Sequence, residues 1–215
     1  MIKNVIWIVV VIAIIWGLYF LFTTGGVEVD PPYEAGVLHP LDHIKGLPAQ
    51  LGDASSTVVV MEYSDFQCPA CKTYYPIIRQ IVQEFEGEIA FVYRHFPLTG
   101  LHPNAEFAAR AAEAAGKQDK FWEMHDLLFE KQNEWATASD ITTMFQAYAT
   151  LLGLDVEKFN LDWRSKEVKD FVTAQRMHAV RSGLQGTPSF FVNGVQIQNP
   201  NSLDEFKQII RSAIK

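Results

Sequence analysis

Hydrophobic and polar residues follow two different periods along the chain, and the changes of period mark the expected elements. Runs rich in β-branched and aromatic residues from Thr57 to Tyr63 and from Ile89 to His95 predict two strands. Between them, apolar residues at helical spacing predict a helix from Pro69 to about Phe85. These segments form a strand-helix-strand unit.

The middle of the chain has the helical period alone. Gly116 is expected to end the first of these helices in a left-handed conformation. Either Ser139 or Asp140 is expected to cap the third. Five helices are predicted in all, at about Pro103–Gly116, Phe121–Phe129, Ile141–Leu152, Asp155–Trp163 and Lys166–Arg181.

The period returns to that of strands near the C-terminus. Ser189–Val192 and Val195–Ile197 are predicted as short strands joined by Asn193-Gly194, a strong hairpin signal. A capping box that begins at Ser202 then opens a helix that runs to about Ile214. The whole order is βαβ, a block of helices, then ββα.

The N-terminal segment has a different character. Val5–Phe22 contains eighteen uncharged, mostly apolar residues, enough with its uncharged flanks to cross a hydrocarbon core of about 30 Å. Lys3 precedes the segment and acidic residues follow it, so the positive-inside rule places residues 27–215 outside the cytoplasm. We expect residues 1–26 to form an uncleaved transmembrane signal-anchor. A cleaved signal peptide and a buried core helix are the alternatives.

Composition and charge narrow the class of protein. Hydrophobic residues make up 48% and charged residues 20%, which excludes a disordered chain. The net charge is −7, and removing the single positive charge of Lys3 leaves −8 for the part of the chain after the apolar segment. So acidic a body has no basic surface for nucleic acid, and we expect no nucleic-acid partner.

The chain contains two cysteines, Cys68 and Cys71, at the start of the predicted helix. A disulfide between them would close only a four-residue loop, so it would contribute little stability through chain entropy. At a helix N-terminus, unpaired N–H groups and the helix dipole favour a thiolate on Cys68. Cys71, one turn later, can act as the resolving thiol. Pro69 suits the first helical turn because it has no N–H group.

Three other interpretations of the cysteine pair are a zinc half-site, two inert core cysteines and a purely structural disulfide. Zinc would require two histidine ligands in addition. Among the histidines, His39 and His43 have suitable spacing, but they lie in the segment expected to be a linker. We therefore predict no metal site and no bound cofactor.

Several motifs carry a family resemblance. They are Glu62 to Cys71, Phe96-Pro97-Leu98 with His102 to Ala105, Gly116-Lys117 with Lys120-Phe121-Trp122, and Gly186 to Gly194. In this order they resemble the DsbA-like thiol-disulfide oxidoreductases of the thioredoxin superfamily. The resemblance extends from about Leu38 to the C-terminus.

The resemblance implies an α/β, thioredoxin-like fold with an inserted all-helical domain. The core would comprise residues 56–100 and 184–215, and the insertion residues 101–183. Residues 27–55, rich in proline and glycine, would form a linker and the first elements of the domain.

The resemblance also implies site residues outside the cysteine pair. The Thr187-Pro188 bond is expected to be cis and to lie beside the cysteines, where Thr187 could pair with an extended substrate. Pro69 and Ala70 complete the active-site loop. Glu62 matches a buried acidic residue that could move a proton to or from Cys71. The alternative is that Glu62 faces solvent.

The remaining polar residues near these motifs are expected to have structural roles. Asp65, Phe66 and Gln67 would shape the active-site loop and its surface. His95, His102 and His125 are interpreted as structural histidines whose hydrogen bonds are satisfied.

These features together predict a protein-disulfide oxidoreductase on the extracytoplasmic face of the cell membrane. Its substrates would be exported polypeptides with free thiols, and a DsbB-like or quinone-linked membrane protein would reoxidise it. The favoured reaction is disulfide introduction. A disulfide reductase or isomerase of the same fold is an alternative, and a membrane-tethered chaperone is an alternative from another class.

Overall fold

The computed structural model describes residues 49–52 and 56–214. Five strands form one mixed sheet in the order β1-β3-β2-β4-β5. Strands β2 and β3 are parallel, and the other neighbouring pairs are antiparallel. The strands are β1 (Ala49–Gly52), β2 (Val58–Ser64), β3 (Ile89–His95), β4 (Ser189–Val192) and β5 (Val195–Gln196).

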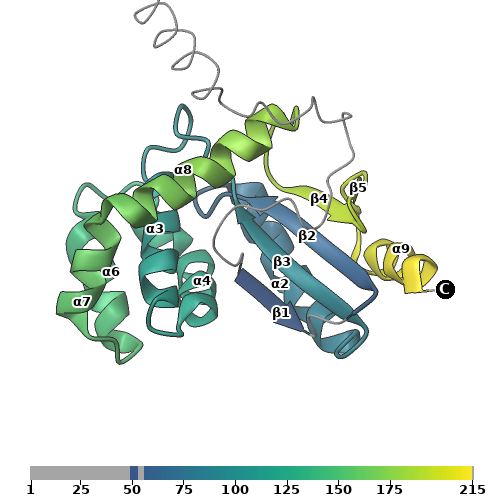
Figure 1. Ribbon diagram of the computed structural model, residues 1–215, viewed down its shortest axis with the longest axis horizontal. Coiled ribbons are helices and arrows are strands. Elements are labelled where there is room, and N and C mark those ends of the chain that lie inside the picture. The colour runs from purple at the N-terminus through teal and green to yellow at the C-terminus, as the bar shows by residue number, and fades with distance from the viewer. Residues whose placement is uncertain (1–48, 53–55, 215) are drawn as a thin grey trace, which may run out of the picture. The chain divides into compact units, whose positions relative to one another are not determined.

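Helices cover both faces of this sheet (Figure 1). Helix α2 (Pro69–Glu84) connects the parallel strands β2 and β3, and it packs on one face together with α9 (Leu203–Ile214). On the other face, Ala179 of α8 (Lys166–Arg181) joins a cluster of apolar residues from β2, β3 and β4. Every residue of β3 is consequently buried, as is typical of a central strand in a covered sheet.

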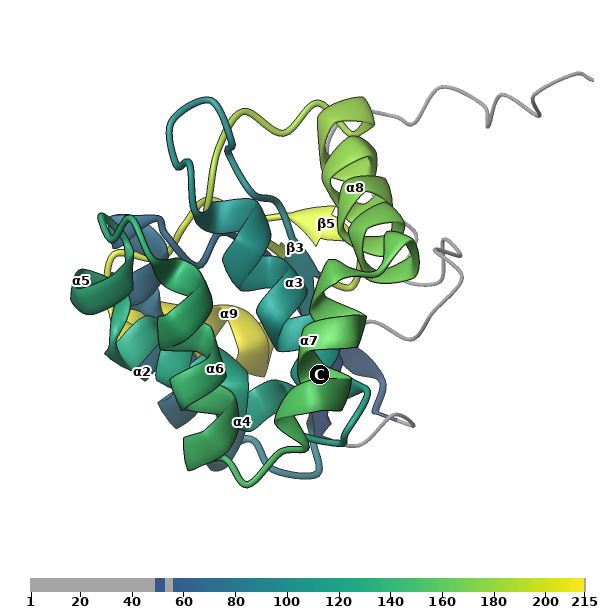
Figure 2. The ribbon, with the colours of Figure 1, turned by 90° about the vertical axis from the view of Figure 1, so that its left-hand side faces the viewer.

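The helical block lies between β3 and β4 in the chain (Figure 2). Helix α3 is its central member, because its alanines are buried on every side and it contacts α4, α7 and α8. The block comprises α3 (Ala105–Gly116), α4 (Phe121–Glu130), α5 (Gln132–Trp135), α6 (Ile141–Leu151), α7 (Val156–Arg164) and α8.

The predicted cap at the start of α6 and the predicted hairpin turn are both confirmed. Asp140, and not Ser139, caps α6, because its Oδ1 accepts a hydrogen bond from the backbone N–H of Thr143 at 3.1 Å. Asn193 and Gly194 have φ values of 50° and 79°, which suit the tight hairpin between β4 and β5.

Gly116 does not end α3 in the left-handed conformation that the sequence predicts. The left-handed residue in this loop is Asp119, with a φ of 60°. Gly116 instead allows close packing, since a Cβ atom added there would lie 3.3 Å from Cβ of Phe121. The missing side chain therefore lets the end of α3 approach the start of α4.

Strand β1 is not predicted by the apolar pattern. It has four residues, of which Leu51 alone has a large apolar side chain. The strand forms because β3 offers a free edge, and Gln50 and Leu51 lie opposite Val92 and Phe91. Pairing with a distant segment thus decides the structure of this short stretch.

None of the helices within the described residues is long and apolar enough to cross a bilayer. The expected signal-anchor at residues 1–26 and the expected linker up to residue 48 lie outside the described residues.

Candidate active site

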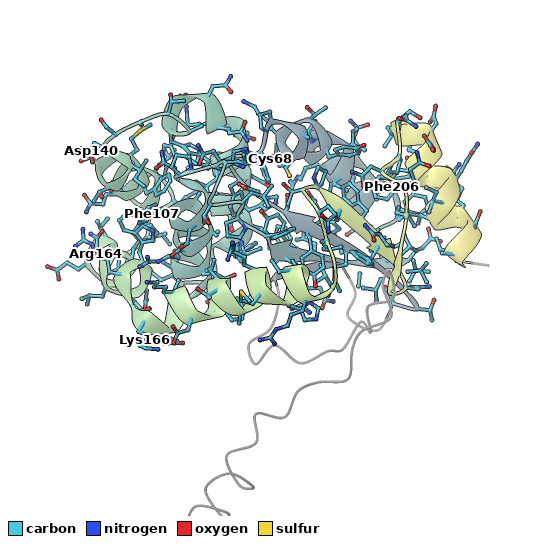
Figure 3. All side chains as sticks on the ribbon, turned by 90° about the horizontal axis from the view of Figure 1, so that it is seen from above. Cys68, Phe107, Asp140, Arg164, Lys166 and Phe206 are labelled. Atoms are coloured by element: carbon cyan, nitrogen blue, oxygen red, sulfur yellow. The ribbon has the colours of Figure 1, made fainter. Side chains whose placement is uncertain are left out.

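The two cysteines lie where β2 leads into α2. Cys68 is the N-cap residue of α2 and has an extended backbone, and Pro69 is the first residue of the helix. Both thiols are free, and Cys68 is 7% exposed whereas Cys71 is fully buried. Figure 3 shows Cys68 between the helical block, marked by Phe107, and the far end of the sheet domain, marked by Phe206.

A second segment approaches Cys68 from much later in the chain. Antiparallel pairing of β2 with β4 sets Tyr63 opposite Ser189, so the residues before Ser189 lie near the end of β2. The Thr187-Pro188 bond is cis, as the resemblance implied. The thiol of Cys68 donates a hydrogen bond to the Thr187 carbonyl at 3.5 Å. The fold therefore brings the Thr187-Pro188 turn next to the cysteines.

The surroundings of Cys68 favour its ionised form. Its pKa is lowered from an ordinary value of 9.0 to about 5, mainly by hydrogen bonding from the Cys71 thiol. Burial opposes this shift, whereas Thr187 and the backbone N–H groups of Ala70 and Cys71 add to it. The buried Thr187 hydroxyl has no hydrogen-bond partner among the described residues while Cys68 is a thiol. It is thus available to a thiolate.

Cys71 has the opposite tendency. Burial raises the pKa of the Cys71 thiol well above its ordinary value of 9.0, and hydrogen bonding to Cys68 and the charge of Glu62 raise it further. At neutral pH the reduced pair is consequently a Cys68 thiolate beside a Cys71 thiol. This asymmetry separates an activated nucleophile at Cys68 from a protonated thiol at Cys71.

Glu62 lies in β2 and is 4% exposed, so the alternative that it faces solvent is wrong. Burial raises the pKa of its carboxyl from 4.5 to about 7, and the charge of Cys68 adds to the rise. The nearby Ser64 hydroxyl lowers this pKa and so opposes the shift, without outweighing the effect of burial. Glu62 can therefore be either protonated or charged near neutral pH.

Asp65 organises the loop that leads to Cys68. Its buried carboxylate accepts hydrogen bonds from the backbone N–H groups of Gln67 and Leu98, at 2.7 and 2.9 Å, and from Nδ1 of His102 at 2.7 Å. These bonds tie the loop to the segment after β3. The expected loop-shaping role of Asp65 is confirmed, although the carboxylate lies inside the protein and not on its surface.

The three histidines expected to be structural all have side-chain partners. In addition to His102, His95 Nε2 lies 2.8 Å from Glu113 Oε1 and His125 Nδ1 lies 3.0 Å from Asp126 Oδ1. Burial lowers the pKa of His125, so its ring is neutral at neutral pH. The structural interpretation of these histidines is confirmed.

Two residues near the thiols are not singled out by the sequence. Tyr93 lies opposite Glu62 in the pairing of β2 with β3, and its buried hydroxyl has no hydrogen-bond partner among the described residues. Ser64 lies two residues after Glu62 on the same strand. The two-residue period of a strand indicates that Ser64 shares the face of Glu62, but nothing in the sequence distinguishes Tyr93 from its apolar neighbours.

No group of three or more histidine, cysteine, aspartate or glutamate side chains within residues 49–52 and 56–214 is arranged to hold a metal ion. The pair His39 and His43 lies outside the described residues.

The low pKa of Cys68 predicts that the stability of the reduced protein depends on pH. Because the folded pKa of about 5 lies below the ordinary 9.0 of an unfolded chain, the thiolate stabilises the folded state fully above pH 9. That stabilisation is lost as the pH falls toward 5. The oxidised protein has no such thiol. Thermal unfolding should therefore show the reduced form gaining on the oxidised form as the pH rises through this window, and a constant difference would contradict the assignment.

Known proteins are similar to this chain in sequence and in fold. The thioredoxin family model matches residues 46–212. Probable disulfide bond formation protein D of Bacillus cereus is 32% identical over 174 residues, which are 77% of this chain and 78% of that protein. The crystal structure of oxidised BdbD from Bacillus subtilis has a TM-score of 0.73 and 26% identity, and the match covers 85% of this chain and 99% of that chain.

A relative of another name shares part of its length with the chain. The Na⁺/H⁺ antiporter NhaA 3 of Salinispora tropica is 36% identical over 172 residues. These residues are 80% of this chain but 24% of the antiporter, so the chain spans about a quarter of that relative. The family model, by contrast, covers the sheet and the helical block together, as a thioredoxin-like fold with a helical insertion. The chain therefore belongs to the thioredoxin family, and it is similar to the disulfide bond formation protein of Bacillus cereus in sequence and to BdbD in fold.

Proposed function

We propose that this protein introduces disulfides into exported polypeptides by dithiol-disulfide exchange through Cys68 and Cys71. The observation that supports this proposal best is the opposite tendency of the two thiols. The pKa of Cys68 is lowered to about 5, whereas that of Cys71 is raised well above 9.0. A stabilised Cys68 thiolate favours the reduced form of the protein, so the oxidised form readily accepts electrons.

The exchange begins with the oxidised pair. A substrate thiolate attacks Sγ of Cys68, the bond between the two sulfurs breaks, and Cys71 leaves as a thiolate. Glu62, with a pKa of about 7, gives this thiolate a proton. A second substrate thiolate then attacks the substrate sulfur of the mixed disulfide and expels Cys68 as a thiolate. Two electrons pass from the substrate to the cysteine pair, and the substrate gains one disulfide.

Thr187 is proposed to align the substrate. Its carbonyl already lies 3.5 Å from Sγ of Cys68, so a strand-like substrate that paired with this backbone would hold its sulfur close to Cys68. Pro69 and Ala70 are both exposed in the first turn of α2, on the side from which a substrate can approach. Pro188 shapes the turn that presents Thr187.

The proposed cycle requires an external electron acceptor. The chain has two cysteines and no third thiol, so the electrons cannot be passed to another cysteine within the chain. A DsbB-like or quinone-linked membrane protein has the chemistry to reoxidise the pair. We place this reaction on the extracytoplasmic face of the membrane, with residues 1–26 as the anchor, because of the apolar segment Val5–Phe22 and the charges that flank it.

The reduction potential of the full-length chain tests the direction of exchange. We expect a value closer to the roughly −120 mV of DsbA than to the roughly −270 mV of thioredoxin, because a stabilised thiolate makes the couple more oxidising. Equilibration in glutathione buffers, with separation of the reduced and oxidised forms, gives the potential. A value near that of thioredoxin would favour a reductase and contradict the proposed direction.

A further inference from the structure

The side chain of Gln132 reaches from the helical block into the active-site loop. Gln132 is the first residue of α5 and is 3% exposed. Its Nε2 donates hydrogen bonds to the carbonyl oxygen of Phe66 at 2.7 Å and to that of Cys68 at 2.9 Å. Figure 2 shows α5 beside the start of α2. A residue of the insertion thus contacts the backbone of a cysteine of the pair.

Helix α5, which carries Gln132, is held in place by its own contacts. Trp135, at the other end of α5, is fully buried, and its Nε1 donates a hydrogen bond to the Leu128 carbonyl of α4 at 2.8 Å. The carbonyl of Gln132 itself accepts a hydrogen bond from Ala136 at 2.9 Å. These contacts fix the position from which the amide of Gln132 points to the loop.

Other polar contacts join the same corner to the loop, but they do not reach the cysteines. Nε2 of Gln67 donates to the Ala136 carbonyl at 2.7 Å, and Nζ of Lys72 donates to Oδ1 of Asn133 at 3.1 Å. Asn104, whose backbone N–H donates to Oε1 of Gln67, binds carbonyls of the segment after Gln132. Gln132 differs from these residues because one of its two acceptors is the Cys68 carbonyl.

The Cys68 carbonyl affects the charge on its own sulfur. It is the first acceptor of α2, and it receives the backbone N–H of Lys72 at 3.1 Å. Its partial negative charge is on the same residue as the thiolate, and Pro69, the next residue, has no N–H group to offset that charge. An amide donor on this carbonyl reduces the local negative potential. It also holds the first turn so that the N–H groups of Ala70 and Cys71 face the sulfur.

We propose that Gln132 is a positioning residue that stabilises the Cys68 thiolate by binding the backbone of the cysteine. The helical block thereby sets the reactivity of the thioredoxin core as well as covering it. This inference rests on the proposed exchange through Cys68, and it adds a residue that acts on that cysteine without touching the substrate.

The test replaces the amide donor and follows the ionisation of Cys68. Gln132→Met keeps the length of the side chain and removes both hydrogen bonds. We expect the pKa of Cys68 to rise by about one unit, equivalent to a roughly tenfold lower ionisation constant. Ultraviolet absorbance of the thiolate in the reduced full-length chain, measured against pH, gives this pKa, since the chain has two thiols and that of Cys71 titrates well above 9.0.

A second variant and a control keep the test decisive. Gln132→Leu is close in shape to glutamine and also lacks the amide donor, so it should raise the Cys68 pKa as Gln132→Met does. It carries the test if the methionine variant does not fold. Gln146→Met on α6 is the control, because Nε2 of Gln146 binds Asn160 at 2.9 Å, away from the loop. Glu62 and Cys71, the other titratable groups that act on Cys68, are the same in all variants.

The outcomes separate this inference from the proposed function. A raised Cys68 pKa in the Gln132 variants, with a larger oxidised fraction in a fixed glutathione buffer, supports the positioning role. An unchanged pKa with equal loss of stability in the reduced and oxidised forms overturns it and leaves a purely structural role. If the unmodified chain has an ordinary Cys68 pKa and catalyses no exchange, the proposed function itself fails.

Discussion

Serine in place of Cys71 is expected to convert the protein into a trap for its substrates. In this variant the Cys68 thiolate attacks a substrate disulfide, forms a mixed disulfide and releases one substrate thiolate, and without the Cys71 thiol this mixed disulfide cannot be resolved from within the protein. Cys68→Ser should instead reduce exchange to the uncatalysed level, because the thiolate with a pKa of about 5 is lost and Cys71 is fully buried. The two substitutions therefore have different consequences although each removes one sulfur.

Non-reducing electrophoresis and mass spectrometry of the full-length chain distinguish these outcomes. Complexes that disappear on reduction should form with Cys71→Ser and should be absent from the double variant Cys68→Ser/Cys71→Ser. Refolding of a reduced substrate whose native state contains disulfides measures the activity. Normal activity in either single variant would refute the assignment of the pair. Protection of the substrate that survives loss of Cys68 would indicate a chaperone.

Replacing Glu62 with glutamine is expected to remove a loss of stability that the reduced protein undergoes as the pH rises. The folded pKa of about 7 lies above the ordinary 4.5 of an unfolded chain. Because the folded pKa is raised, the carboxyl is protonated in both states below pH 4.5 and costs no stability there. The free energy of unfolding then falls as the pH rises through 7, where the buried carboxyl must become charged. The shift corresponds to about 3 kcal/mol of free energy of unfolding. The Glu62→Gln variant should lack this loss.

Chemical denaturation at pH 4 and at pH 8 measures the effect. The informative quantity is the change between the two pH values, since the buried amide adds a contribution that does not depend on pH. Glu86→Gln, which removes an exposed carboxylate, is the surface control. The same pH dependence in Glu62→Gln as in the unmodified protein would exclude a titrating buried carboxyl.

Glu62→Gln also tests the proposed proton transfer to Cys71. The amide cannot give the departing Cys71 thiolate a proton, so formation of the mixed disulfide should slow near neutral pH. Stopped-flow measurement of the reaction between the oxidised protein and a small thiol gives this rate. An unchanged rate across the neutral range would remove Glu62 from the mechanism.

The local parts of the fold were predictable because neighbouring residues decide them. The strand-like periods at β2 and β3, the helical period of α2 and the Asn193-Gly194 turn all appear at or near their predicted places. The prediction that Gly116 ends α3 in a left-handed conformation is wrong, and the reason is not local. Its role depends on Phe121 of the next helix, and a glycine that permits close packing looks the same in sequence as one that ends a helix.

The environment of Glu62 shows the limit of pattern reasoning at the site. Both faces of β2 pack against apolar clusters, so no solvent-exposed face reveals which way Glu62 points. The alternation of a strand predicts which residues share a face, but not which face lies under Cys71. The resemblance indicated a buried acid at this position, and the packing of α2 on the sheet provides the reason.

By itself, the sequence determined the helix that begins with Pro69, the two cysteines at its start and the block of helices that interrupts the sheet. These features depend on residues a few positions apart. Only the tertiary structure decided what surrounds Cys68: the Thr187 carbonyl, 119 positions later in the chain, and the Gln132 amide, 64 positions later. Such contacts exist because sheet pairing and helix packing close long stretches of chain, and local preferences do not specify where the distant groups meet.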